Sequence, residues 1–336
     1  MQSDRWAQRP ECHPYLLEGT MRERFSRVPR HLFRVHHPGS GGVTNESYAS
    51  SAEWEALAPQ FTDVFAFREV AQAGQSLDNH LRWKQVPGKP SPFVSWTSSL
   101  LTAIAYIFYL YGKGESLDQI YLTVLDASRC HPDVFLDDLS LIEAFQCTWP
   151  YTGLEDLWKL RTGLKGPVYY FGEFLSQGSL SIKGKSETVT AEQLIERGLF
   201  TLQPEFKRFL GWNLHGSAEE NPKWANAVMD YRKFLAQEDH KFRLGPVQMK
   251  AASNIVSLFG ASLGLRFPMM VHLMGLLPKP GLDELFELTI MTPALSNPYK
   301  NFRFLPEMNL FRANGLFETD RVYGIVSQVD QNRELM

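Results

Sequence analysis

The chain has 336 residues, which is enough for one large domain or two ordinary ones with a substantial core. Apolar residues make up 44% of it and aromatic residues 13%, which excludes an intrinsically disordered chain. The net charge of −3 and the pI near 6.3 provide no broad basic field, so the composition does not favour nucleic acid as a partner.

Up to about residue 204, short strand patterns alternate with helix patterns. Runs rich in β-branched and aromatic residues predict strands at 31–37, 92–96, 119–127, 168–174 and 180–182. Apolar periodicity predicts helices at 76–84, 99–112, 138–145 and 190–198. The mixture predicts an α+β core at about 30–202, within a first domain at 1–204.

After residue 205 the patterns are mostly helical, with helices expected at 221–237 and 281–289. The final 45 or so residues are rich in Pro, Asn and Phe and give little signal. We therefore expect a mostly helical C-terminal region at 205–336.

One apolar stretch, 251–277, is longer than the roughly 20 residues that a membrane-spanning helix needs. It carries Arg266 and Pro268 near its middle, and an arginine at bilayer depth costs about 3 kcal/mol. Two core helices broken at the sequence LRFP are favoured over a membrane span, with His272 as a core histidine.

The three cysteines, Cys12, Cys130 and Cys147, are far apart and odd in number, which fits a reducing compartment better than a disulfide framework. The first residues lack a basic segment followed by an apolar one, the pattern of a signal peptide. We expect an intracellular protein, cytoplasmic or nuclear, with no membrane segment.

Standard catalytic motifs are missing. The glycine run HPGSGG at 37–42 lacks the lysine of a phosphate-binding loop, which predicts a surface loop, and no Gly-x-Ser-x-Gly element occurs. Five potential metal ligands cluster in CHPDVFLDD, residues 130–138, but no second cluster appears that would complete a site. A polar loop that ends in a helix cap is the favoured interpretation, and no metal is predicted.

Three segments carry polar groups where strands are expected. Arg34 lies inside an apolar strand, and an arginine there needs an anionic partner. Ser95 ends a strand just before a Ser/Thr-rich helix start, where backbone N–H groups favour anions or Ser98 and Ser99 serve as helix caps. Glu173 lies in the uncharged aromatic run YYFGEFLSQGSL, as either a solvated edge residue or a carboxylate held for chemistry.

Arginine, then Ser-x-Ser/Thr, then glutamate, on three successive strands, resembles the ADP-ribosyltransferase superfamily of the bacterial toxin type. The resemblance rests on LFR, FVSWTSSLLTAIAYI, DQIYLTVLDA, DVFLDD and GEFLSQGSL and covers about residues 30–202. The segments HLRW, SWTSSLL and YYFGEFLSQG also resemble an uncharacterised domain family common in filamentous fungi. The resemblance implies a split β-sheet core with flanking helices.

The resemblance also implies NAD as substrate and a set of roles. Glu173 would stabilise the cation that forms when nicotinamide leaves and would accept a hydrogen bond from the ribose 2′-hydroxyl. Arg34 would hold a phosphate or ribose group, and Ser95 would orient Glu173. The Val35 backbone and Thr97 would also contact NAD. Trp96, Tyr106 or Tyr170 would form an aromatic wall for nicotinamide or pack in the core. Phe171 and Tyr170 would lie on the acceptor side.

Two positions depart from the family pattern. Arginine-modifying toxins carry Glu or Gln two residues before the catalytic glutamate, and Phe171 stands there. Trp96 replaces a small residue in the Ser-x-Ser/Thr element, where its bulk would reshape the nicotinamide pocket or face the core. The first hypothesis is therefore a transferase that modifies a non-arginine acceptor. We expect this acceptor to be a protein of unknown identity. NAD hydrolysis, or a catalytically degenerate protein-binding module, remains an alternative.

Overall fold

The computed structural model describes residues 28–57, 63–64, 69–164, 168–214, 223–236, 245–260 and 264–278. They divide into two compact units, each built from several chain segments. The first comprises 1–32, 38–98 and 125–186, and the second 33–37, 99–124 and 187–336. The expected change near residue 204 falls inside the second unit. The predicted helix at 281–289 and Cys12 lie outside the described residues.

The fold is α+β with antiparallel strand pairs and flanking helices, as the sequence predicts. In the first unit the hydrogen-bonded strand order is β6, β7, β4, and a separate sheet has the order β2, β3, β8. The strands of this unit are β2 (Gly42–Thr44), β3 (Tyr48–Ser51), β4 (Phe93–Thr97), β6 (Leu136–Asp137), β7 (Glu173–Gln177) and β8 (Ser179–Ser181).

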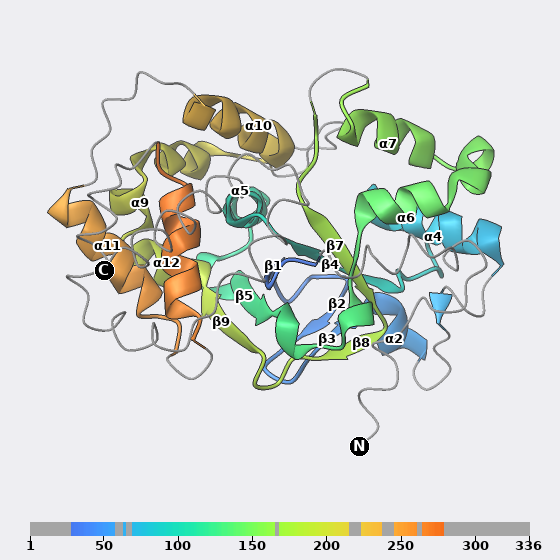
Figure 1. Ribbon diagram of the computed structural model, residues 1–336, viewed down its shortest axis with the longest axis horizontal. Helices are drawn as coiled ribbons and strands as arrows, with labels where there is room; N and C mark the ends of the chain where they lie inside the picture. The colour runs from blue at the N-terminus through green and yellow to red at the C-terminus, as the bar shows by residue number, and fades with distance from the viewer. Residues whose placement is uncertain are drawn as a thin grey trace, which may run out of the picture. The chain divides into compact units, whose positions relative to one another are not determined.

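Four α-helices and three short 3-10 helices complete the described part of the first unit. They are α2 (Ala52–Leu57), α4 (Val70–Leu81), η3 (Ala127–Arg129), η4 (Pro132–Val134), α6 (Asp138–Ala144), η5 (Gln146–Tyr151) and α7 (Leu154–Arg161). Figure 1 shows α4, α6 and α7, coloured cyan to green, gathered on one side of β4 and β7.

Two apolar clusters lie on opposite faces of β4 and β7, because successive strand residues point to opposite sides. Phe93 and Leu175 contribute to a cluster that includes buried leucines of α4, α6 and α7. Val94, Trp96 and Phe174 belong to the other cluster. Burial on both faces fixes the register of this strand pair, since a shift by one residue would exchange the two faces.

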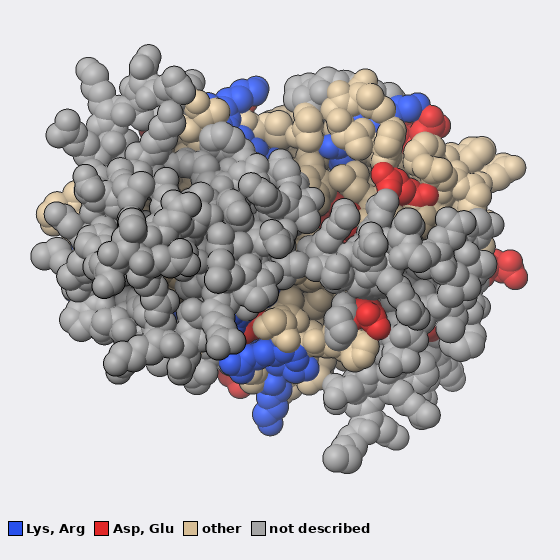
Figure 2. Space-filling model, viewed as in Figure 1, with Lys and Arg blue, Asp and Glu red and all other residues tan. Residues whose placement is uncertain are grey.

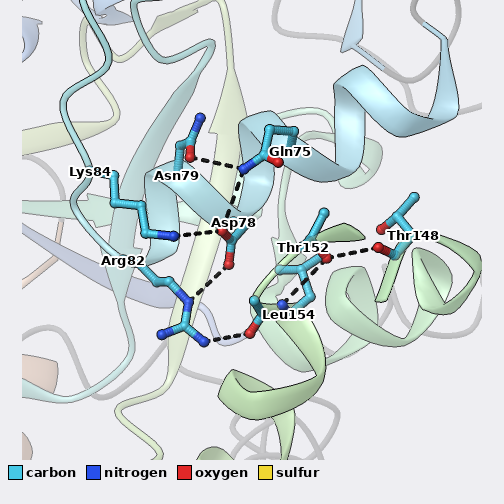
Figure 3. A network of polar contacts seen from close by, with 9 residues as sticks. Gln75, Asp78, Asn79, Arg82, Lys84, Thr148, Thr152 and Leu154 are labelled. Carbon is cyan, nitrogen blue, oxygen red and sulfur yellow. Dashed lines mark hydrogen bonds and ion pairs between the residues drawn. The ribbon is translucent and has the colours of Figure 1, made fainter. Parts of the chain in front are cut away.

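A polar network joins the end of α4 to the start of α7 (Figure 3). The buried carboxylate of Asp78 accepts hydrogen bonds from Arg82 Nε and Lys84 Nζ, each at 2.9 Å. Arg82 Nη2 also donates to the carbonyl oxygen of Gly153, the residue that precedes α7. The network therefore fixes the position of α7 relative to α4.

The chain leaves α4 through a left-handed residue. The backbone N–H of Trp83 donates to His80 O at 3.0 Å, and that of Lys84 donates to Asn79 O at 2.8 Å. This pair of bonds is the Schellman pattern, which usually places glycine at the left-handed position. Here Trp83 adopts a φ of 54°, and its side chain is 46% exposed.

In the second unit β1, β5 and β9 are hydrogen-bonded in that order. The strands are β1 (His31–His36), β5 (Tyr121–Asp126) and β9 (Ser186–Thr190), and the helices are α5 (Leu100–Gly112), η2 (Leu117–Gln119), α8 (Ala191–Glu196), α9 (Leu199–Leu202), η6 (Pro204–Gly211), α10 (Lys223–Ala236), α11 (Pro246–Val256) and α12 (Arg266–Gly275).

Two helices, α11 and α12, occupy the long apolar stretch, as predicted, but α11 already ends at Val256 and LRFP forms the start of α12 and not the break. Pro268 is the third residue of α12, where its missing N–H is not needed for a helical hydrogen bond. Arg266 Nε donates to Phe259 O at 2.9 Å. His272 is a core residue whose pKa is lowered to about 4 by burial, so the ring is neutral at pH 7.

Candidate functional site

The candidate site lies on one face of the β4–β7 pair. The antiparallel register places Thr97 opposite Glu173 and Trp96 opposite Phe174. Because side chains alternate along a strand, Ser95, Thr97 and Glu173 share the face that meets α4, α6 and α7. Trp96 and Phe174 point to the other face.

A hydrogen bond joins two of the predicted catalytic residues. Ser95 Oγ donates to Glu173 Oε1 at 2.7 Å, although the residues are 78 positions apart in the sequence. The Glu173 side chain is 15% exposed, so it lies largely out of water while a part of it still reaches the surface. The strand pair thus places a largely desolvated carboxylate next to an oriented hydroxyl.

A histidine of α4 extends this contact. His80 Nε2 lies 2.8 Å from Ser95 Oγ, and His80 Nδ1 lies 2.6 Å from Ser91 Oγ. Because Ser95 donates its proton to Glu173, we assign the Nε2 proton of His80 as the donor to Ser95 and the Ser91 hydroxyl as the donor to Nδ1. The chain of donors therefore runs in one direction, from Ser91 through His80 and Ser95 to Glu173.

An arginine of α7 contacts the other oxygen of the carboxylate. Arg161 Nη2 donates to Glu173 Oε2 at 3.0 Å. Arg161 Nη1 forms an ion pair with Asp138, the first residue of α6. The side chains of Arg161 and Asp138 are 6% and 0% exposed. One buried guanidinium thus lies between two carboxylates.

The turn before Glu173 differs from the sequence prediction. The structure begins β7 at Glu173, whereas the aromatic run predicts a strand over 168–174. Gly172 adopts a φ of +64°, a left-handed conformation that an extended strand cannot hold. Thr97 Oγ1 donates to Phe171 O at 2.7 Å, and Ser98 N donates to Gly172 O at 2.9 Å. These bonds fix the turn that delivers Glu173 to the site.

Three aromatic residues that the sequence left open between ligand contact and core are buried. Trp96 is buried, with its Nε1 donating to Ser176 Oγ at 3.0 Å and its ring edge-on to Phe135. The structure therefore gives Trp96 the core-packing role rather than that of a nicotinamide wall. Tyr170 and Phe171 are also buried, so neither ring forms an exposed acceptor surface in this conformation.

The other predicted NAD contacts belong to the second unit. Arg34 lies on β1, and burial lowers its pKa to about 10, an effect that nearby Tyr106 partly opposes. Tyr106, on α5, stacks on Tyr109 with 5.8 Å between ring centroids and meets Trp224 edge-on at 6.1 Å. Val35 is half-buried on β1. The roles of Arg34, Val35 and Tyr106 toward NAD stay predictions.

Ser99 and the end of the acidic loop act as helix caps. Ser99 Oγ accepts from Thr102 N at 3.0 Å at the start of α5, and Asp137 Oδ1 accepts from Ser140 N at 2.8 Å at the start of α6. This confirms a cap at the end of the loop at 130–138. Among the described residues, no group of three or more His, Cys, Asp or Glu side chains is placed to hold a metal ion.

The described surface and helices bear on two classes of partner. On the face seen in Figure 2, the described acidic and basic side chains occur in small groups of both signs. Of the helices in the described ranges, none has the length and apolar character needed to cross a membrane.

A family model matches residues 27–194, which is half of the chain, and its description reads Domain of unknown function (DUF7587). The chain belongs to this family. No curated protein and no solved structure gives a significant match to the DUF7587 chain. All members of the cluster around Glu173 lie within the matched DUF7587 segment.

Sequence reasoning missed His80, Ser91 and Arg161, and it did not place Asp138 in this cluster. His80 falls in a helix that the sequence predicts, but its partners Ser91 and Ser95 lie on other elements. Arg161 ends α7, a helix that the apolar pattern did not reveal. An available signal in the DUF7587 segment is the pair of acids Glu155 and Asp156 in the first turn of α7, with Lys159 and Arg161 in the last.

Proposed function

We propose that the protein cleaves NAD at the bond between nicotinamide and ribose and transfers ADP-ribose to a non-arginine acceptor. Glu173 is the catalytic carboxylate in this proposal. The observation that carries it is the 2.7 Å hydrogen bond from Ser95 to Glu173, because it forms the Ser–Glu pair that the resemblance to ADP-ribosyltransferases implies.

The chemistry needs a fixed negative charge. As nicotinamide leaves, positive charge develops at the ribose carbon and its ring oxygen, and a carboxylate already in position stabilises that charge. Glu173 also has the free lone pairs to accept a hydrogen bond from the ribose 2′-hydroxyl, since each carboxylate oxygen accepts more than one donor. Its 15% exposed side chain leaves a route for the ribose to approach.

The neighbours of Glu173 support its orientation. The Ser95 hydroxyl points at Oε1 because His80 already donates to the Ser95 oxygen and Ser91 holds the far side of the imidazole. A carboxylate held in this way loses little freedom when the transition state forms. The roles of Arg34 and Tyr106 toward NAD remain those that the resemblance implies.

Hydrolysis of NAD, with water as acceptor, is a second candidate that one observation favours. Phe171 stands where arginine-modifying toxins place the group that activates the acceptor, and here its ring is buried. A site with no acceptor-activating side chain at that position lets water take the ribose. Free ADP-ribose would then be the product in place of modified protein.

The test is NAD consumption by the purified protein and a Glu173→Gln variant, with nicotinamide, ADP-ribose and intact protein mass measured together. Glutamine keeps the shape but removes the charge, so we expect turnover to fall at least about 100-fold, as for loss of one preorganised group. NAD affinity should change much less, because the proposed ground-state contacts lie elsewhere.

Glu155→Gln, on the exposed side of α7, is the matched control. Among the described residues the ion-pair partner of Glu155 is Lys159, which lies outside the cluster around Glu173, so this variant should keep full activity. Modified protein among the products supports the transferase, and free ADP-ribose supports the hydrolase. A folded Glu173→Gln protein that consumes NAD at the wild-type rate would refute the role of Glu173. No turnover by the wild type would favour a protein-binding module.

A further inference from the structure

Arg161 connects the two carboxylates of the cluster. It contacts Glu173 Oε2 at 3.0 Å through Nη2 and Asp138 through Nη1, so both ends of its planar fork are used. Two negative groups share one positive group, and all three side chains are at least 85% removed from solvent. Asp138 thus orients Arg161, and Arg161 in turn orients Glu173.

Asp138 holds Arg161 in place. Its side chain is fully buried, and its oxygens make no well-aligned hydrogen bond to the described residues, so the charge of Arg161 is what compensates its burial. A buried carboxylate without a counter-charge is strongly unfavourable. Arg161 therefore cannot turn toward solvent without leaving Asp138 uncompensated.

The backbone on both sides of this ion pair is rigid. Leu141 and Ile142 of α6 and Leu154 and Leu157 of α7 are buried in one apolar cluster, together with Leu175 of β7, two residues after Glu173. A close-packed interior permits only small shifts of its elements. The distance between the Arg161 fork and the Glu173 carboxylate is consequently set by packing.

We propose that Arg161, anchored by Asp138, is a positioning residue that fixes the Glu173 carboxylate against Ser95. The inference rests on the proposed function for its role in turnover. Ser95 holds Oε1 and Arg161 holds Oε2, so the carboxylate cannot rotate about its last bond. The Arg161 side chain is 6% exposed, which is too little for it to bind NAD directly, so it acts through Glu173.

The test uses a double variant, Asp138→Leu with Arg161→Met. Replacing both members of a buried ion pair by apolar side chains is often neutral or stabilising, so this protein should fold and keep a cooperative thermal transition. Glu173 then loses its second anchor, and the Ser95 hydroxyl alone no longer fixes the carboxylate. We expect kcat for NAD consumption to fall about 10- to 100-fold, with KM for NAD within about 3-fold of the wild type.

Arg161→Lys supplies a conservative rescue. A lysine keeps the charge beside Asp138 but lacks the planar fork that reaches two carboxylates at once, so its kcat should lie between those of the wild type and the double variant. A purely structural role predicts that any variant with wild-type stability also has wild-type kcat. A folded double variant with unchanged kcat would overturn the proposal.

Crystal structures of the wild type and the double variant provide a readout that does not depend on turnover. We expect the Glu173 carboxylate to leave Ser95 Oγ, or to occupy several rotamers, in the double variant. A carboxylate that stays on Ser95 refutes positioning by Arg161. If the wild type consumes no NAD but the carboxylate is released in the variant, the proposed function fails and the positioning role stands.

Discussion

Two buried carboxylates of the first unit, Asp78 and Asp138, are compensated in opposite ways. Asp78, 1% exposed, accepts from two cations, Arg82 and Lys84, both partly exposed (Figure 3). Asp138 has Arg161 as its counter-charge and shares it with Glu173. The first network has more positive than negative groups, and the second has the reverse.

The difference separates a structural network from a candidate functional one. Two cations compensate the charge of Asp78, and Arg82 also donates from Nη2 to Gly153 O, which holds the start of α7. The shortage of positive charge at Asp138 and Glu173 leaves net negative charge in a largely dry place. Excess negative charge in such a place does not stabilise the fold. It does stabilise a transition state in which positive charge develops.

The largest expected effect comes from removing one cation from each network. Arg161→Ala leaves Asp138 buried without a counter-charge, and we expect the free energy of unfolding to fall by about 3–5 kcal/mol. Arg82→Ala leaves Asp78 with Lys84 as its counter-charge, and the Arg82 side chain that is removed is 30% exposed, so the loss should be about 1 kcal/mol. Urea unfolding of both variants measures the contrast.

Equal losses for the two arginine variants would show that the networks do not differ in compensation. Adding Asp138→Leu to Arg161→Met should restore most of the stability, because the fully buried carboxylate of Asp138 is then removed together with its cation. Failure of that restoration would mean that Arg161 stabilises the fold through packing and not through charge.

The second expected effect tests the fastening of α7. A methyl group at Gly153 would lie 2.6 Å from Arg82 Nε and 2.8 Å from Asp78 Oδ1, so Gly153→Ala must displace the arginine. We expect a loss of about 1–3 kcal/mol in the free energy of unfolding. Gly41→Ala, with no atom within 4 Å of the added carbon, is the matched control, and its change should stay within about 0.5 kcal/mol.

The smallest expected effect concerns the left-handed residue beside the Asp78 network. Trp83→Gly removes the strain of a side chain at a φ of 54°, so we expect a gain of about 0.5–1 kcal/mol in thermal or urea unfolding. Trp83→Ala keeps the strain and should bring no gain. If alanine stabilises as much as glycine, the exposed ring itself, and not the backbone, is the source of the strain.

Local signals predicted much of the fold. The apolar run after Ser99 and the cap at Asp137 mark the starts of α5 and α6, and LRFP marks the start of α12. These features depend on residues within one or two turns of each other. The start of β7 depends instead on the left-handed backbone of Gly172, and there the aromatic pattern predicted a strand that begins five residues too early.

The Ser95–Glu173 pairing was accessible from motif order, whereas His80, Arg161 and the use of Asp138 were not. His80 and Arg161 reach Ser95 and Glu173 from two different helices, and Asp138 pairs with Arg161 from a third. Composition does not reveal which helices share a face. Trp96 shows the same limit in reverse, since the sequence could not tell a ligand wall from core, and the alternation along β4 decided for core.

The separation of Ser95 from Glu173 by 78 residues has a consequence for folding kinetics. Closing so long a loop costs entropy that is recovered only when distant strands pair, so such contacts form slowly compared with a helix such as α5. The carboxylate cluster also needs α4, α6 and α7 docked on the same face. A probe placed at Glu173 would therefore report the completion of folding of this unit, well after its helices have formed.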